Sequence, residues 1–315
     1  MNAERFFTHP LGIVFSAGTA AFLWGSAFPA IKISYEVLEI GPNELSEQIL
    51  FAGYRFLLAS ILIFIFLKLT KKTIRLQKQH VLSLSRIGAF QTFIQYILFY
   101  IGLSYATGIQ GSIIAGTTTF FQILFAHFLY HDDKLSIRKG IGLLLGFSGV
   151  IIVNMTKGEF ILHFGLGEIL LLLAMASGGF GNILARNATN SMEVGYITSY
   201  EMLFGAVGLI LAGLPGAGFV PFHFTGKALW LLVYLAFLSA TGYILWNNVM
   251  KYNQVGKISV YLFLMPVFGV FLSNIFLNEK LNVFVFIGLF FVTWGIIIVN
   301  RQKSVKLEEE STLTV

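Results

Sequence analysis

Long apolar runs alternate with short polar gaps along almost the whole chain. A helix needs about 20 mostly apolar residues to cross a bilayer. The pattern therefore predicts an all-α integral membrane protein with ten transmembrane helices and no remaining soluble domain. The predicted spans are residues 12–32, 50–68, 83–104, 109–130, 138–155, 166–186, 196–213, 227–250, 256–277 and 282–300.

Composition leads to the same class of protein. Of the 315 residues, 56% are hydrophobic and 11% are charged, whereas soluble domains carry about 25% charged residues. The chain has no cysteine, which excludes disulfides and thiolate metal sites. The first apolar run is interpreted as a span and not as a removed signal peptide. The net charge of +6 lies in the gaps between spans, and we expect no nucleic-acid partner.

The distribution of lysine and arginine predicts the orientation in the membrane. If both termini are cytoplasmic, only Lys32, Lys157, Lys227 and Lys280 lie outside and Arg55 lies within a span. The remaining sixteen basic residues then lie inside, as the positive-inside rule requires. We therefore expect a multi-pass protein with both termini in the cytoplasm. The charged tail, residues 301–315, is predicted to be disordered.

An internal repeat relates the two halves of the chain. The string GLLLGFSGVIIVN at 142–154 returns as GLFFVTWGIIIVN at 288–300, with an offset of 146 and seven of thirteen positions identical. Three further matches keep the same order. They are YRFL at 54–57 with YEML at 200–203, DKLS at 133–136 with EKLN at 279–282, and QYIL at 95–98 with GYIL at 242–245, the last offset by 147.

The repeat predicts two units, residues 12–155 and 164–300, each with five spans. Because five is odd, the second unit must enter the membrane upside down relative to the first. Inverted repeats occur in many secondary transporters, where two related halves open alternately to the two sides. The pattern therefore indicates a carrier that works by alternating access.

Several segments resemble the EamA-type transporters of the drug/metabolite transporter superfamily. They are WGSAFPAIK at 24–32, YRFLLA at 54–59, MPVFGVFLSNIFLNEKLN at 265–282 and the run that ends at Asn300. The first half has the weaker form FFQILFAHFLYHDDKLS at 120–136, with Phe120 in place of Pro266 and Asp132-Asp133 where the family more often has Gly-Glu. The resemblance covers residues 12 to 300 and implies ten helices in two five-helix repeats. It also implies transport of amino acids, other metabolites or drugs, mostly across bacterial inner membranes.

Polar and aromatic residues within the spans are the candidates for a substrate cavity. Gln91 and Gln95 lie one helical turn apart, and Tyr243, Trp246 and Asn247 share one helix face. The repeat match of this face includes Tyr96, and Thr118 belongs to a patch of threonines. The resemblance places the helices of Trp24 and Asn182 beside the cavity. Hydrogen bonds between helices, aromatic packing and threonine bonds to their own backbone are the alternative explanations.

Prolines and charged residues are the candidates for gating or coupling. Pro29 and Pro266 are expected to kink their helices, either as hinges or as a static shape. Arg55 and Glu201 occupy equivalent positions of the repeat. The favoured interpretation is that both lie near an interface and extend toward water. The alternative for Glu201 is a protonatable coupling site.

Other function classes lack the residues that they need. The two aspartates, Asp132 and Asp133, fall in one predicted loop, the histidines lack a metal-binding helix pattern, and no phosphate-binding glycine loop is found. We therefore expect no enzyme, no metal and no cofactor.

The favoured function is export of small neutral or zwitterionic metabolites such as amino acids. The protein is expected to act as a monomer or weak homodimer whose partners are its substrate and the lipid bilayer. The runner-up is a phosphorylated-metabolite or nucleotide-sugar exchanger, which would need several buried basic residues where only Arg55 comes close. A membrane enzyme and a channel are further alternatives.

Overall fold

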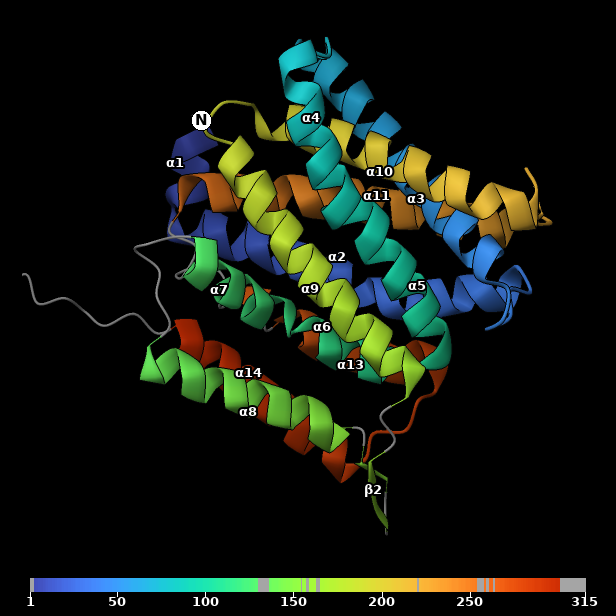
Figure 1. The fold of residues 1–315 in the computed structure, drawn as a ribbon, viewed down its shortest axis with the longest axis vertical. Helices are drawn as coiled ribbons and strands as arrows, with labels where there is room; N and C mark the ends of the chain where they lie inside the picture. Colours follow the sequence, from blue (N-terminus) through green and yellow to red (C-terminus); the bar gives the residue numbers. More distant parts are fainter. Residues whose placement is uncertain are drawn as a thin grey trace, which may run out of the picture.

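Packed helices make up most of the fold of this computed structural model (Figure 1). The structure describes residues 3–129, 136–153, 155–156, 159–162, 165–219, 221–253, 258, 261–262 and 264–300. The first half holds α1 (Ala3–Thr8), α2 (Pro10–Val37), α3 (Leu45–Leu69), α4 (Lys78–Ile87), the π-helix η1 (Gly88–Ile94), α5 (Gln95–Tyr105), α6 (Gly108–Ala115), α7 (Thr118–Leu129) and α8 (Ile137–Val153). The second half holds α9 (Leu166–Ala188), α10 (Val194–Ala217), α11 (Gly226–Tyr252), α13 (Leu264–Leu277) and α14 (Val283–Asn300).

The predicted spans fall on these helices. Seven helices in the described part of the chain are long and apolar enough to cross a membrane, and α13 and α14 are shorter apolar helices. The prediction of a helical, multi-pass membrane protein is confirmed. The predicted span 83–104 is continuous but passes through the π-helical turn η1, and 109–130 divides into α6 and α7 at Gly116 and Thr117. Ten crossings remain a prediction.

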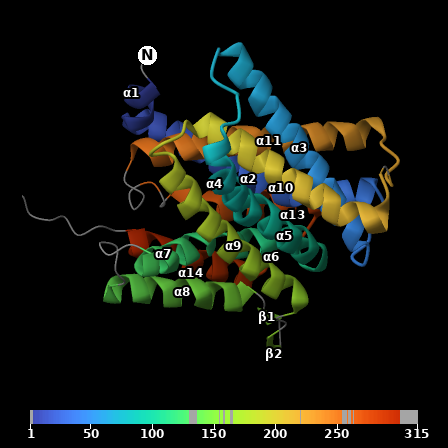
Figure 2. The same ribbon diagram turned by 45° about the horizontal axis from the view of Figure 1, so that its top comes forward.

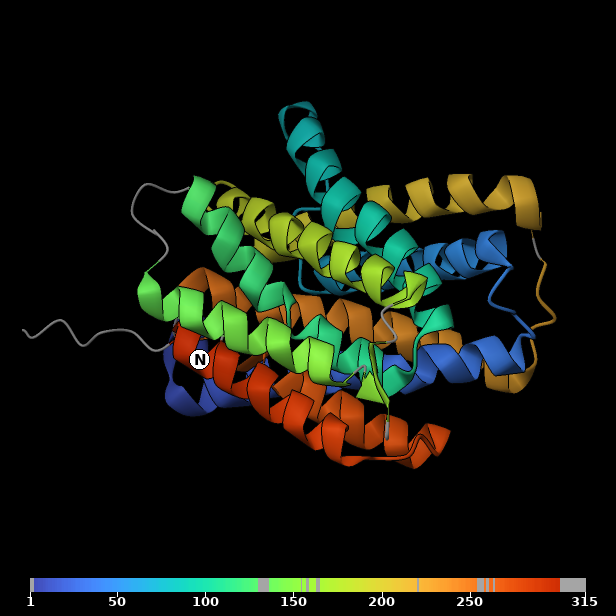
Figure 3. The ribbon, with the colours of Figure 1, turned by 60° about the horizontal axis from the view of Figure 1, so that its bottom comes forward.

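Helices from the two halves pack against one another throughout the bundle. α3 lies against α10, α8 against α14, α2 against α11 and α13, and α9 against α5 and α7. Figure 2 shows α3 and α10 crossing on one side of the molecule, and Figure 3 shows α8 beside α14 on another. α1 and the last turn of α14 lie on the same side of the bundle, at the left in Figure 1. The connections from α2 to α3 and from α10 to α11 lie on the opposite side.

Glycines bring α8 and α14 into close contact. A Cβ atom added to Gly149 would lie 2.6 Å from the carbonyl oxygen of Gly288, and one added to Gly295 would lie 2.6 Å from that of Gly142. Lipid chains are as apolar as leucine, so helices in a bilayer gain by close packing of small residues and not by hiding apolar surface from water. These glycines therefore explain how the two helices pack side by side.

A short β-hairpin joins the two halves, and the sequence pattern did not predict it. β1 (Met155–Thr156) pairs antiparallel with β2 (Glu159–Leu162), with Met155 opposite Leu162. The hairpin projects beyond the helices near the end of α8 (Figure 1). Its strands are too short to show the alternation of apolar and polar residues by which a strand is recognised.

Some expectations concern residues outside the described ranges. They are the loop acids Asp132 and Asp133 and the tail at 301–315. The predicted span 256–277 is described as a helix only from Leu264 onward, as α13.

Candidate functional site

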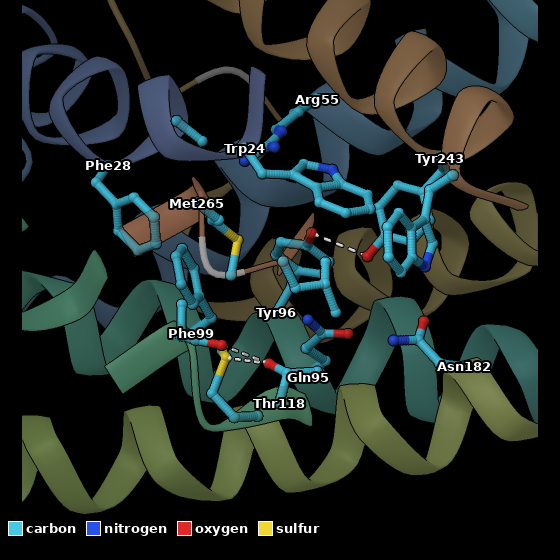
Figure 4. Close-up of a pocket in the computed structure, with 15 residues that line it drawn as sticks. Trp24, Phe28, Arg55, Gln95, Tyr96, Phe99, Thr118, Asn182, Tyr243 and Met265 are labelled. Carbon is cyan, nitrogen blue, oxygen red and sulfur yellow. Dashed lines mark hydrogen bonds between the residues drawn. The ribbon is translucent and has the colours of Figure 1, made fainter. Parts of the chain in front are cut away.

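A cavity of about 80 Å³ lies between helices of both halves of the chain (Figure 4). It is lined by Trp24, Ala27, Phe28, Arg55, Gln95, Tyr96, Phe99, Ala115, Thr118, Met175, Asn182, Tyr243, Trp246, Leu262 and Met265. One water molecule needs at least about 10–15 Å³ of such space and takes about 30 Å³ in the liquid, so the cavity has room for a few water-sized groups.

Aromatic side chains form one wall of the cavity. The hydroxyl groups of Tyr96 and Tyr243 lie 3.2 Å apart and share a hydrogen bond. The Trp24 ring packs edge-on against Tyr243 at 5.3 Å between centroids and against Trp246 at 5.9 Å. Trp24 sits directly over Gly242, where an added Cβ atom would lie 2.8 Å from the indole nitrogen. The Trp24 indole can therefore occupy this position only because residue 242 has no side chain.

Polar side chains from three helices face the aromatic wall. The Gln95 amide lies flat over Gly178 of α9, where an added Cβ atom would be 2.5 Å from the amide oxygen. Thr118 Oγ1 donates to the carbonyl oxygen of Ala115 and contacts the Met175 sulfur at 3.0 Å. Asn182 Oδ1 accepts a 2.6 Å hydrogen bond from Gln91. Thr118 thus bonds its own backbone, as the alternative explanation expected, and still lines the cavity.

Gln91 and Asn247 lie behind the cavity wall, which differs from the prediction that they line it. Gln91 is covered by α9 at Gly181, where an added Cβ atom would lie 2.7 Å from the Gln91 Cβ atom. Asn247 faces α10 and donates to Thr198 Oγ1 at 3.1 Å. Both amides therefore form hydrogen bonds to neighbouring helices. Gln91 bonds the lining residue Asn182, whereas the partner of Asn247, Thr198, does not line the cavity.

Arg55 is buried in the protein interior, and the expectation that it extends to an interface is wrong. Its side chain is 1% exposed. Nε donates to the Leu235 carbonyl oxygen and to Ser239 Oγ, and Nη1 donates to the Tyr100 hydroxyl. α11 and α5 thus hold the guanidinium group, and it reaches the cavity instead of the membrane surface.

Glu201 is likewise buried, with a side chain that is 0% exposed, so the interface interpretation is wrong for this residue too. Thr92 in the π-helix donates a 2.6 Å hydrogen bond to its Oε2 atom. The Oε1 atom has no hydrogen-bond partner within the described ranges. Ionisable groups buried among membrane helices are costly and commonly mark ion or proton pathways.

The two prolines lie in described helices from the two halves. Pro29 lies within α2, which continues through it to Val37. Pro266 lies in α13, which the structure describes from Leu264 onward. The expected kinks and the gating role of both prolines remain predictions.

Most of the lining residues that sequence analysis missed are apolar. They are Ala27, Phe28, Phe99, Ala115, Met175, Leu262 and Met265. In a chain that is 56% hydrophobic, an apolar residue that faces the cavity has the same signal as one that faces lipid. The offset of 147 that relates QYIL to GYIL also matches Phe99 to Trp246, and this match is the one signal in the sequence that could have identified Phe99. Within the described residues, no cluster of three or more His, Asp or Glu side chains is placed to hold a metal ion.

Comparisons with known proteins agree with the membrane fold. The EamA-like transporter family matches residues 11–155 and again residues 165–301. The uncharacterized transporter YoaV of Bacillus subtilis is 23% identical over 292 residues, which cover 91% of this chain and 94% of the relative. The S-adenosylmethionine/S-adenosylhomocysteine transporter of Chlamydia muridarum is 22% identical over 275 residues, which cover 82% of each chain.

A solved crystal structure has the same fold. It superposes with a TM-score of 0.67 at 14% sequence identity, covering 92% of this chain and 96% of the solved chain. At this identity the likeness concerns the fold alone.

Proposed function

The chain belongs to the EamA-like transporter family, and from this premise we propose that it is a secondary transporter of small neutral or zwitterionic metabolites, such as amino acids. Its relatives are named as transporters and not as enzymes. The proposed mechanism is alternating access, in which the cavity between the two halves opens first to one side of the membrane and then to the other.

Pairing of matched positions across the two halves is the observation that carries the proposal. Tyr96 and Tyr243, 147 positions apart, bond to each other. Gly149 packs on Gly288 while Gly142 packs on Gly295, so the same pair of matched positions meets twice with the halves exchanged. Such reciprocal contacts are those that a two-fold axis generates.

Contacts between whole helices follow the same rule. α2, the first long helix, contacts α11 and α13. α9, the first long helix of the second half, contacts α5 and α7, which hold the corresponding places in the first half. Two halves with interchangeable contacts can adopt two related arrangements at similar energy, which supports an inverted repeat and alternating access.

The chemistry of the cavity supports a neutral or zwitterionic solute. Aromatic rings, one amide over Gly178 and apolar side chains make up most of the lining, and Arg55 is the single charged side chain among the lining residues of the described chain. The buried position of Arg55 thus puts one fixed charge at the cavity, where the sequence analysis had placed this residue near an interface. Arg55 favours the runner-up, an exchanger of phosphorylated solutes, to the extent that it attracts an anion. One guanidinium group balances one negative charge, whereas a phosphate monoester carries close to two at neutral pH.

Direction, location and coupling complete the proposal. We place the protein in the bacterial inner membrane with both termini in the cytoplasm, acting as a monomer or weak homodimer that exports its substrate. Helices of one chain supply the described lining of the cavity, as a monomeric carrier requires. Glu201 is the proposed coupling residue, because it is a buried carboxyl group with one oxygen bonded to Thr92.

Counterflow in liposomes tests the proposal. Purified protein is first screened by thermal shift against amino acids, nucleosides, polyamines and sugar phosphates, since a ligand that binds the folded state raises the melting temperature. A binding solute is then tested in proteoliposomes, where a carrier shows saturable uptake that the unlabelled solute inside accelerates. Current without saturation or counterflow would instead identify a channel.

A pair of double variants tests the site. Gln91→Ala with Gln95→Ala should reduce counterflow strongly. Gln77→Ala with Gln79→Ala, two exposed glutamines at the start of α4 and away from the cavity lining, should leave it unchanged. Normal transport by the first double variant would contradict the assignment of the cavity as the substrate site.

A further inference from the structure

We propose that a basic surface at the junction of α3 and α4 binds the headgroups of anionic phospholipids. Five exposed side chains make up this basic surface: Lys68, Lys71, Arg75, Lys78 and Arg86. Figure 1 shows the end of α3 and the start of α4 at the edge of the bundle, where they project beyond the neighbouring helices. The inference goes beyond the proposed transport function and does not depend on which solute is carried.

The basic surface carries charge that the protein itself does not balance. No aspartate or glutamate occurs between Glu47 and Asp132 in the sequence. The neighbouring Lys72 forms a salt bridge with Glu193 at 3.1 Å. Within the described ranges, the five side chains of the basic surface have no hydrogen bond and no ion pair. Their positive charges are therefore available to an anionic ligand.

Hydrogen bonds to α10 hold the backbone of the connection between α3 and α4. The Tyr200 hydroxyl donates to the Ile74 carbonyl oxygen at 2.6 Å, and the Gln77 backbone N–H donates to the Tyr196 hydroxyl at 3.1 Å. Lys71 leaves α3 with a φ of 55°, in the left-handed region that residues other than glycine seldom adopt. The backbone that carries the basic side chains is thus held in one path along α10.

The basic surface lies at the depth of lipid headgroups. α3 and the helical run Lys78–Tyr105 are both long and apolar enough to cross a membrane. Residues 70–77 join them directly, so this connection cannot extend far from the bilayer surface. Exposed apolar side chains flank the basic ones, since Leu69 is 78% and Leu82 is 62% exposed. A surface that mixes apolar and basic side chains fits the boundary between acyl chains and phosphate groups.

The basic surface continues along one face of α4. Lys78, Leu82 and Arg86 follow one another at intervals of four residues, so they share a helix face, and all three are exposed. At 1.5 Å per residue the two basic residues lie about 12 Å apart along the helix. Leu84 and Ile87 are buried on the other face, against α9 and α10. A helix with one apolar and one basic face is typical of the membrane interface.

Anionic phospholipid is the partner that matches both properties of the surface. Its phosphate accepts hydrogen bonds from lysine, and the planar fork of Arg75 or Arg86 can bind two phosphate oxygens at once. Its acyl chains cover the exposed leucines. Basic segments next to transmembrane helices are attracted to the anionic lipids of the cytoplasmic leaflet, and the predicted orientation places the basic surface at that leaflet. An acidic soluble protein would match the charge alone.

Lipid binding by the purified wild-type protein tests the proposal. Fluorescence anisotropy of labelled phosphatidylglycerol and labelled phosphatidylcholine in detergent measures the two affinities. We expect phosphatidylglycerol to bind about 10- to 100-fold more tightly at about 0.1 M salt. The ratio should fall at about 1 M salt, because the Debye length shortens from about 10 Å to about 3 Å. Equal affinities at low salt, or a ratio that salt does not change, would overturn the proposal.

Charge removal at two places then assigns the lipid to the basic surface. Lys71→Gln with Lys78→Gln should lower the ratio of the two affinities about tenfold. Lys227→Gln with Lys280→Gln removes the same charge from two exposed positions outside the basic surface and should keep the wild-type ratio. An unchanged ratio in the first double variant, or an equal loss in both, would overturn the assignment.

A short poly-glutamate peptide separates lipid from an acidic protein partner. The peptide competes for the same charges but offers no acyl chain to Leu69 and Leu82. We therefore expect the peptide to displace labelled phosphatidylglycerol at least about tenfold less effectively than unlabelled phosphatidylglycerol does. Displacement by the peptide at equal or lower concentration would overturn the proposal in favour of an acidic protein.

Discussion

The hydroxyl groups of Tyr96 and Tyr243 lie 3.2 Å apart although 147 residues separate them in the chain. The two residues occupy matched positions in the strings QYIL and GYIL of the two halves. In the proposed inverted repeat, a residue that bonds its own counterpart would lie close to the axis that relates the two halves. Both tyrosines also line the cavity.

A double-mutant cycle measures the tyrosine pair. Tyr96→Phe and Tyr243→Phe each remove one hydroxyl from a buried hydrogen bond. We expect a coupling of about 0.5–1.5 kcal/mol between the two substitutions in the free energy of unfolding. Unfolding by detergent titration provides the measurement. Strictly additive effects would show that the hydroxyl groups bond other partners.

Glycine contacts between α8 and α14 predict a local loss of stability. Gly149→Ala places a Cβ atom within 2.6 Å of the Gly288 carbonyl oxygen, so the helices must separate. We expect a loss of about 1–3 kcal/mol. Gly140→Ala is the matched control on the same helix, because an added Cβ atom there meets nothing within 4 Å. A melting temperature that falls equally in both variants would contradict the close approach.

The side chain of Glu279 caps the start of α6. Its two carboxylate oxygens accept hydrogen bonds from the backbone N–H groups of Gly108 and Ile109 at 2.7 and 2.8 Å. Glu279→Ala should lower the free energy of unfolding by about 0.5–2 kcal/mol, because a helix start loses its acceptor and a favourable charge. Lys280→Ala, at the exposed next position, should change it little. Thermal melts of the two variants make the comparison.

Substitution of Gly178, which is not a lining residue, should alter substrate binding by moving the Gln95 amide. An alanine there would lie 2.5 Å from the Gln95 amide oxygen and must displace the amide. We expect Gly178→Ala to raise the KM of transport about tenfold while the maximal rate changes less, because binding geometry is lost. Gly18→Ala on α2 has open space around the added Cβ atom and is the control. An unchanged KM in well-folded Gly178→Ala would argue against Gln95 as a binding group.

Proton coupling through Glu201 predicts a change in pH dependence. Wild-type transport should vary with pH, and Glu201→Gln should give a flat profile because its amide cannot take up or release the proton. Glu193→Gln, at the exposed start of the same helix, should keep the wild-type profile. Transport by the wild type that does not vary with pH would remove Glu201 as a coupling residue.

The amino-acid sequence by itself determined the class of the protein and the positions of most helices. Whether a run of 20 residues enters a bilayer depends on its own composition, so α2, α3 and α9 to α11 lie close to the predicted ranges. The repeated segments could also be found from the sequence, because finding them requires only a comparison of the chain with itself. The family resemblance followed from the same segments and agrees with the family match.

The tertiary structure decided what each polar side chain does. Arg55 and Glu201 lie near helix ends in the predicted spans, where a long side chain could reach water. In the fold, however, α5 and α11 hold Arg55 and the π-helix η1 bonds the buried Glu201. Gln91 and Gln95 share a helix face, yet Gly181 lets α9 cover the first while the second lies over Gly178 and borders the cavity. Hydropathy describes how one residue meets lipid. Which residue meets the cavity depends on the neighbouring helices, and only their packing supplies that information.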